Sequence, residues 1–178
     1  MEEPEIPTEK LQEDIHHHAQ HAGEAWVSWL ALSTAILAAL AAATSLLAGH
    51  HANEAMIEQV RASDQWSYYQ AKGIKKAVKE SRNDLLTALG HAPEAADRAQ
   101  VEKYDSQQRE IDEKAQELEA SSHRHLHRHE ILARGVTMYQ IAIAIGAVAA
   151  LVRKRPFWYL SLGLGVLGIY FMIYGMTA

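Results

Sequence analysis

Histidines crowd one short polar stretch of the chain. The ten residues SSHRHLHRHE, Ser121 to Glu130, hold four histidines and two arginines just before the chain turns apolar. On a helix, His123 and His127 lie four residues apart and share one face, and His125 and His129 share a nearly opposite face. Two imidazoles at this spacing can chelate a divalent metal, and further ligands normally complete such a site.

Further ligands lie at the start of the same polar segment. A hairpin folded symmetrically about Gly90 to Pro93 would bring His129 level with Glu54. It would also bring His125 level with Glu58. The resulting His/Glu collar is a predicted metal site for zinc, or a proton site titrating near about pH 6.5, and consists of His50, His51, Glu54, Glu58, His125 and His129. The alternative is a merely polar border, because His and Arg side chains tolerate the edge of a membrane.

A second histidine group lies near the N-terminus and comprises His16, His17, His18 and His21. It falls within an acidic segment, residues 1–24. Adjacent histidines bind metal opportunistically, so this group alone predicts no function.

Sequence signatures of catalysis and of nucleic-acid binding do not occur. The chain has no cysteine, no Walker loop, no G-x-S-x-G and no H-E-x-x-H. The formal net charge is −5 and no segment forms a basic stripe. We therefore expect neither an enzyme nor a nucleic-acid partner, and no cofactor other than zinc.

Apolar residues are segregated into three runs. The chain has 178 residues, 48% of them hydrophobic, yet its mean hydropathy is only −0.20. The uncharged runs 25–49, 135–152 and 157–178 each approach the roughly 20 residues that cross a bilayer. They predict three transmembrane helices, with a short basic loop at 153–156. Because no Asp, Glu, Lys or Arg lies within the runs, a transporter is the least favoured function.

The segment 50–134 has the pattern of two helices. Apolar residues at heptad spacing predict a weak coiled-coil seam. In the first helix these are Ile57, Val60, Ala71, Ile74, Val78, Leu85 and Ala88, interrupted by Asp64, Ser67 and Ser81. In the second they are Val101, Tyr104, Ile111, Ala115, Leu118 and Leu132. Gly90 is the expected helix stop and Pro93 the expected start of the next helix.

Together these patterns predict an antiparallel helical hairpin inserted between the first and second spans. Each arm would extend about 60 Å if it ran on into its span. So thin a seam leaves an isolated hairpin marginal, because helices in proteins are stabilised mainly by packing. We therefore expect arms of several subunits to pack together as a homo-oligomer. Two further features, the aromatic group Trp66, Tyr68 and Tyr69 and the basic stretch KGIKKAVK, fit either subunit packing or docking of another protein.

Small residues recur inside the last two spans. The residues Gly163, Gly165 and Gly168 match G-x-G-x-x-G, but they lie within an apolar helix rather than between a strand and a helix. We read them, with Ala142, Gly146 and Ala150 of the preceding span, as grooves for close helix packing. Gln140 is expected to form a hydrogen bond between helices.

Positive charges bear on orientation in two opposed ways. The loop RKRP favours a cytoplasmic position for residues 153–156, and hence hairpin arms outside the cytoplasm. The cations Arg61, Arg124, Arg128 and Arg134 lie near span ends and favour the reverse.

Four stretches carry a resemblance to a known family. They are WVSWLALSTAILAALAA, LLAGHHANEAMIEQVRASDQWSYYQAKGIK, ILARGVTMYQIAIAIGA and RKRPFWYLSLGLG. Through them the chain closely resembles a bacterial membrane family, domain of unknown function 4337, over nearly its whole length. The resemblance implies an integral protein of the bacterial inner membrane and no particular activity. The histidines of Ser121 to Glu130 are not part of the family pattern.

The sequence thus predicts an all-α integral membrane protein with three spans and a long hairpin between the first and second. The expected function is that of a non-enzymatic, homo-oligomeric scaffold or docking protein, whose partners are lipid, further copies of itself and another protein bound by the arms. The alternative is a channel-like or sensing assembly that uses the His/Glu collar.

Overall fold

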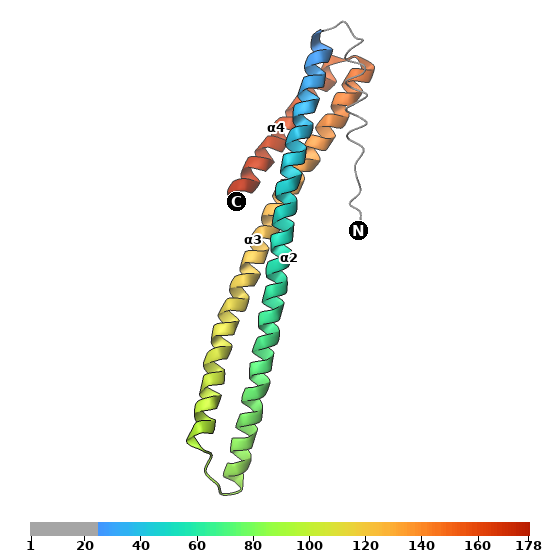
Figure 1. Ribbon diagram of the computed structural model, residues 1–178. Coiled ribbons are helices and arrows are strands. Elements are labelled where there is room, and N and C mark those ends of the chain that lie inside the picture. Colours follow the sequence, from blue (N-terminus) through green and yellow to red (C-terminus); the bar gives the residue numbers. More distant parts are fainter. Residues whose placement is uncertain (1–24) are drawn as a thin grey trace. The chain divides into compact units, whose positions relative to one another are not determined.

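The computed structural model describes residues 25–178, and these form three α-helices (Figure 1). They are α2 (Ala25–Ala88), α3 (Ala95–Val152) and α4 (Arg155–Thr177). No strand occurs in the described residues, so the expected all-helical class is confirmed for them. The predicted segment 1–24, with its four histidines, lies outside them.

Each of the three helices contains an apolar stretch long enough to cross a membrane. The composition explains the first helix directly, because Ala and Leu, which favour helix, dominate the apolar stretch of α2. In the apolar stretch of α3, Ala is joined mainly by Ile and Val. α2 continues without a break through Gly49, the one glycine between its apolar and polar halves. The three apolar helices expected from the sequence are therefore present in length and composition.

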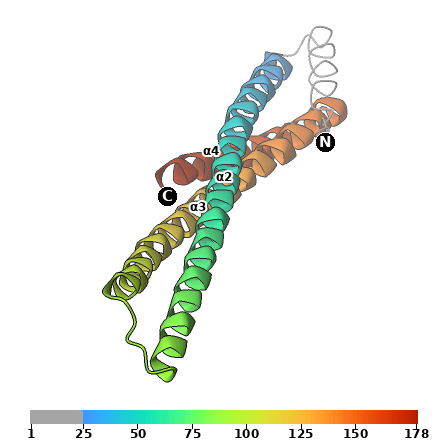
Figure 2. The same cartoon turned by 60° about the horizontal axis from the view of Figure 1, so that its bottom comes forward.

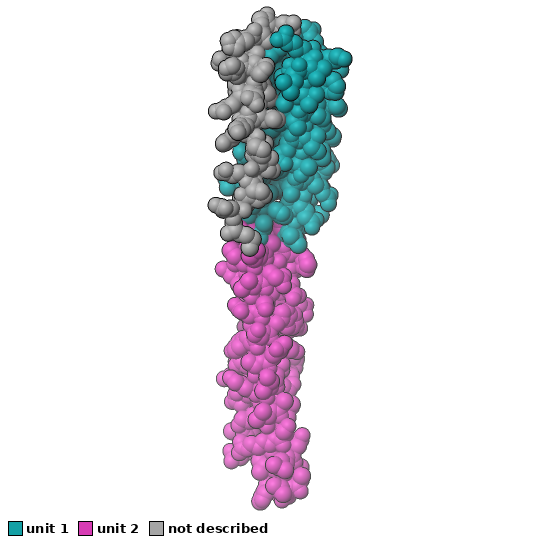
Figure 3. Space-filling model, turned by 90° about the vertical axis from the view of Figure 1, so that its right-hand side faces the viewer, with its two compact units in different colours: residues 1–52, 126–178 teal, residues 53–125 magenta. Residues whose placement is uncertain are grey.

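The chain divides into two compact units, coloured separately in Figure 3. Of the described residues, the apolar unit contains 25–52 and Leu126–Ala178, and the hairpin unit contains Asn53–His125.

Inside the apolar unit, residues from all three helices are buried. One cluster contains Trp26, Val27, Leu30 and Ala149, and another contains Leu37, Tyr139, Ala142 and Ile143. Large apolar side chains also cover the outside, among them Trp29, Leu32, Ile36, Leu46, Val166 and Tyr170. Exposed apolar side chains on helices of this length are compatible with contact with lipid.

The hairpin unit consists of two antiparallel helical segments, which run side by side in Figures 1 and 2. The Ser122 hydroxyl donates to the Ala55 carbonyl (2.8 Å), and Trp66 Nε1 donates to Glu119 Oε1 (2.7 Å). Near the turn, Lys79 Nζ lies 2.7 Å from Asp97 Oδ1.

Gly90 ends α2 as predicted. Its φ is +80°, in the region that favours glycine. The His91 N–H donates to the Leu86 carbonyl and the Gly90 N–H to the Thr87 carbonyl, the hydrogen-bond pair of a Schellman cap. Pro93 does not start the next helix: α3 begins two residues later, and the carbonyl of Glu94 accepts its first hydrogen bonds.

Candidate interaction surface

The predicted register of the hairpin is wrong by six residues. Symmetrical folding would set Ser122 level with Arg61, but its hydroxyl binds the carbonyl of Ala55. In the apolar unit, His129 Nδ1 lies 2.9 Å from the Ala48 carbonyl oxygen, six residues before Glu54. Six residues correspond to about 9 Å along a helix.

The asymmetric turn accounts for this shift. After the cap at Gly90 the chain runs back before α3 begins, so the start of α3 lies beside the penultimate turns of α2 rather than beside its end (Figure 2). The ion pairs of Asp97 with Lys79 and Arg82 mark that position.

The residues of the predicted His/Glu collar fall in both compact units, so the collar as a whole stays a prediction. Between residues 25 and 178, no three His, Cys, Asp or Glu side chains lie where they could hold a metal ion. A ring nitrogen of His129 is hydrogen-bonded to the Ala48 carbonyl oxygen. The rings of His50 and His51 lie 5.5 Å apart, with an angle of 52° between their planes. The zinc site was predicted from the symmetrical register, which the turn does not adopt.

The small residues of the apolar unit occupy places where helices approach closely. A Cβ added at Gly146 would lie 2.7 Å from a methyl of Thr34 in α2 and 3.4 Å from the Ser161 hydroxyl in α4. At Gly168 it would lie 2.6–3.0 Å from the ring of Tyr139, which is fully buried.

The remaining predicted packing residues differ among themselves. Gly165 faces the side chain of Leu37, and Ala142 is buried with its carbonyl accepting a hydrogen bond from Ser161 (2.6 Å). Ala150 is half-buried. Gly163 has open space around it.

Gln140 does not form the expected hydrogen bond to another helix within the described residues. Besides His129, polar side chains that bind across helices in the apolar unit include Ser161, on the Ala142 carbonyl, and Trp158, whose Nε1 donates to Ser33 (3.1 Å). Sequence reasoning missed both, since serine and tryptophan are ordinary in such spans.

The seam of the hairpin unit is small and polar on the α2 side. The only buried apolar residues of the unit are Ala55, Ala62, Ile111 and Ala115. The α3 half of the predicted seam therefore faces α2, because Ile111 and Ala115 are buried. From α2, however, the inward positions are Ala55, Ala62, Tyr69, Lys76 and Asn83.

The α2 half of the predicted seam points away from α3. We call this row the α2 outer face and define it as Ile57, Val60, Asp64, Ser67, Ala71, Ile74, Val78, Ser81, Leu85 and Ala88. Every one of these residues is exposed. The large ones are exposed by 43% (Ile57), 56% (Val60), 66% (Ile74), 63% (Val78) and 61% (Leu85). Two positions along a helix are about 200° apart, so this row lies opposite the inward row that begins at Ala55.

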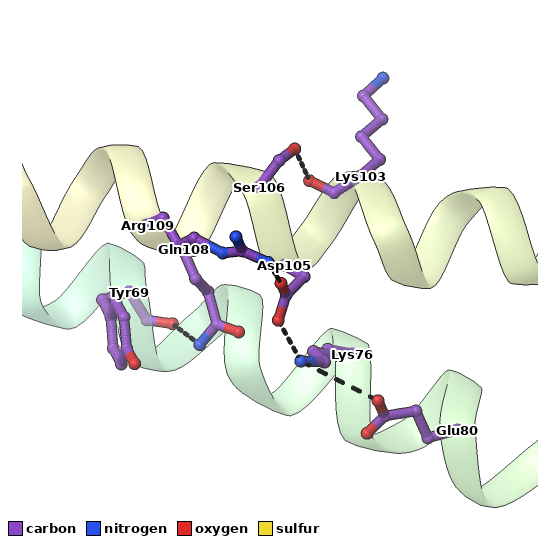
Figure 4. A network of polar contacts seen from close by, with 8 residues as sticks. All are labelled: Tyr69, Lys76, Glu80, Lys103, Asp105, Ser106, Gln108 and Arg109. Atoms are coloured by element: carbon purple, nitrogen blue, oxygen red, sulfur yellow. Dashed lines mark hydrogen bonds and ion pairs between the residues drawn. The ribbon is translucent and has the colours of Figure 1, made fainter.

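Polar contacts take the place of a large apolar seam (Figure 4). The Lys76 ammonium of α2 and the Arg109 guanidinium of α3 both donate to the Asp105 carboxylate. The hydrogen bond from Lys76, and then that from Arg109, lower the pKa of Asp105 to about 2. The same contact with Asp105 raises the pKa of Lys76.

A second ionic group lies next to the turn. Asp97 is buried and lies 2.7 Å from Lys79 and 3.1 Å from Arg82. The hydrogen bond from Lys79 chiefly lowers the pKa of Asp97. Since few apolar groups meet between the arms, these charge-assisted hydrogen bonds define which residues of α2 and α3 are level.

The aromatic group faces in two directions. Trp66 binds Glu119 and meets Tyr69 edge to face at 5.7 Å, so both lie towards α3. Tyr68 is half-exposed, and Lys72 lies over its ring at 5.0 Å and over that of Tyr104 at 5.4 Å. These rings are therefore engaged within the hairpin unit.

Comparison with known proteins places the chain in a family. Neither a curated protein nor a solved structure matches it. The family described as Domain of unknown function (DUF4337) matches residues 26–178, which include all three apolar stretches and the α2 outer face. The chain therefore belongs to the DUF4337 family, as its sequence motifs had indicated.

Proposed function

We propose that this protein is a non-enzymatic scaffold of the bacterial inner membrane, anchored by three transmembrane helices. Copies associate through residues 53–125, which lie outside the bilayer. Three helices of sufficient length and apolar character support the membrane anchor. The basic loop Arg153–Lys154–Arg155 supports a cytoplasmic position for the connection between α3 and α4, and hence a hairpin on the other side.

The observation that carries this proposal is the α2 outer face. Five large aliphatic side chains repeat at heptad spacing over about 42 Å of helix and have no cover within the hairpin unit. Water-exposed apolar stripes of this period are typical of helices that bind other helices. The thin inner seam adds a reason for association, because the hairpin has little apolar core of its own.

The proposal is tested by the mass of the detergent-solubilised protein, measured by native mass spectrometry. We expect a discrete oligomer for the natural chain. Val78→Glu should shift the distribution to monomer, because it inserts a charge into the contact. The matched control is Glu113→Lys, an equally drastic change at an exposed position of α3, which should leave the mass unchanged.

Circular dichroism of each variant separates loss of association from loss of folding. Val78 makes no contact that the hairpin needs, so the helical signal should persist. A natural chain that is monomeric at every concentration would overturn the proposal.

A further inference from the structure

We infer that the partner of the α2 outer face is the same face of α2 in a second copy, aligned parallel and in register. This inference rests on the proposed function and specifies its contact. Three observations within the hairpin unit lead to it: which face is apolar, where the flanking charges lie, and where polar residues interrupt the row.

Only α2 offers an apolar outer surface. Within residues 95–125 of α3 no large apolar side chain is exposed. The exposed residues there are mostly charged, including Arg98, Glu102, Lys103, Glu113, Lys114 and Glu117. A second copy can therefore cover the α2 outer face with an equivalent apolar surface only by presenting its own α2.

The flanking charges select the parallel arrangement. Along one flank of the α2 outer face lie the cations Arg61, Lys75 and Arg82. Along the other flank lie the uncharged residues Ser63, Gln70 and Ala77, followed by Asp84 near the turn. In an antiparallel pair each flank would lie beside the same flank of the second copy, and the cations would face cations. In a parallel pair the cationic flank meets the uncharged flank, and the flanking cations stay apart.

The polar residues of the row select the register. In-register pairing sets each apolar residue of the row against its own apolar counterpart and confines Asp64, Ser67 and Ser81 to three polar layers, in one of which the two Asp64 side chains face each other. A shift by one heptad would bury the Asp64 carboxylate against Ile57 or Ala71. An unpartnered buried charge is costly, and single polar residues at such positions are known to define register. Arg61, one turn before Asp64, supplies a nearby opposite charge.

Disulfide cross-linking can test this directly, because the natural chain has no cysteine. Ile57→Cys and Leu85→Cys lie near opposite ends of the α2 outer face and both replace exposed side chains. Each full-length variant is oxidised in membrane vesicles and examined on a non-reducing gel. We expect both single variants to form cross-linked dimers, since parallel in-register helices bring equivalent positions within disulfide distance. Glu113→Cys on α3 is the control and should not cross-link.

Each other outcome overturns the inference in a recognisable way. An antiparallel pair would cross-link only when the two variants are mixed, so that an Ile57→Cys copy is joined to a Leu85→Cys copy. A pair shifted by one heptad would cross-link Ile57→Cys only with Asp64→Cys. If no variant cross-links while native mass spectrometry still detects an oligomer, the copies meet at another surface and the proposed function survives without this contact. A monomeric mass would remove both.

Discussion

At the scale of single residues, the apolar unit and the hairpin unit use different chemistry to bring helices together. In the apolar unit, glycines allow the close approach: Gly146 leaves room for Thr34, and Gly168 leaves room for the ring of Tyr139. In the hairpin unit, charged side chains such as Asp105 and Lys76 do so. This difference follows from the solvent we propose for each, since lipid offers no hydrophobic drive to helix association and makes close packing decisive.

Gly168→Ala should destabilise the protein. The added Cβ would lie 2.6–3.0 Å from the Tyr139 ring, which is buried and has little freedom to move. Overpacking of this kind costs about 1–3 kcal/mol, partly offset by the better helix propensity of alanine, up to about 1 kcal/mol. Thermal unfolding in mild detergent measures the difference. Gly163→Ala is the matched control, because its Cβ meets nothing within 4 Å, and it should be neutral or slightly stabilising.

The Asp105 network predicts a dependence on acid. Because the native pKa of Asp105 is about 2, below its usual value of 3.8, the ionised form is favoured by folding. Its contribution to stability is therefore complete above pH 3.8 and is lost as the pH falls towards about 2. Asp105→Asn should lower the melting temperature at neutral pH and make it less sensitive to pH in this window. Asp84→Asn, at an exposed position of α2 outside the network, should behave like the natural chain. Identical acid profiles for all three would contradict the assignment.

At the scale of elements, α2 has two distinct faces within the hairpin unit, one in contact with α3 and one exposed. Its inward row combines alanines with polar side chains and contacts α3, whereas its outward row is mainly apolar, with heptad spacing that Asp64, Ser67 and Ser81 interrupt. Because the inward row depends on polar contacts, the turn that aligns them matters more than it would in a hairpin with a large apolar core. That turn depends on one residue, Gly90, with its positive φ.

Gly90→Ala should therefore destabilise the hairpin. An L-residue with a side chain loses about 1–2 kcal/mol in this left-handed conformation, although open space surrounds the site. Urea unfolding followed by circular dichroism should show the loss. Gly49→Ala, in the middle of α2 and equally uncrowded, should instead stabilise the protein by roughly 0.5–1 kcal/mol. Equal effects of the two changes would show that backbone conformation at Gly90 is not the cause.

At the scale of the whole molecule, three apolar helices and two connections imply an alternation of sides. If each helix crosses the membrane, the connection between α2 and α3 and the connection between α3 and α4 lie on opposite sides. In the orientation that we propose, the positive loop between α3 and α4 lies in the cytoplasm. Some cations of the hairpin form ion pairs with acids of the hairpin itself: Arg82 with Asp97, and Arg109 with Asp105.

Cysteine labelling tests this alternation. His91→Cys, in the exposed turn of the hairpin, should react with a membrane-impermeant maleimide in spheroplasts. Lys154→Cys, in the basic loop, should react only after the membrane is permeabilised. The reverse pattern would place the hairpin in the cytoplasm, and labelling of both without permeabilisation would contradict three crossings.

The helices themselves could be read from the sequence because their signals are local. Uncharged runs of span length, the glycine stop at Gly90 and the heptad period over 57–88 each depend on neighbours along the chain. The family, too, was recognisable from contiguous motifs such as HHANEAM. The start of α3 was misplaced by two residues, since Pro93 fits equally well just before a helix as at its first turn.

What only the tertiary structure decided is how α2 meets α3. Two rows of α2 repeat every seven residues, one beginning at Ala55 and one at Ile57, and apolar character favoured the second. The structure uses the first, because alanines allow close approach and because Lys76 and Lys79 reach acids on α3 from that side. The register followed from the same contacts and from the shape of the turn, and it differs from the symmetrical register on which the collar around His129 was predicted. Pairing depends on which distant side chains fit one another, and no periodicity within a single helix contains that information.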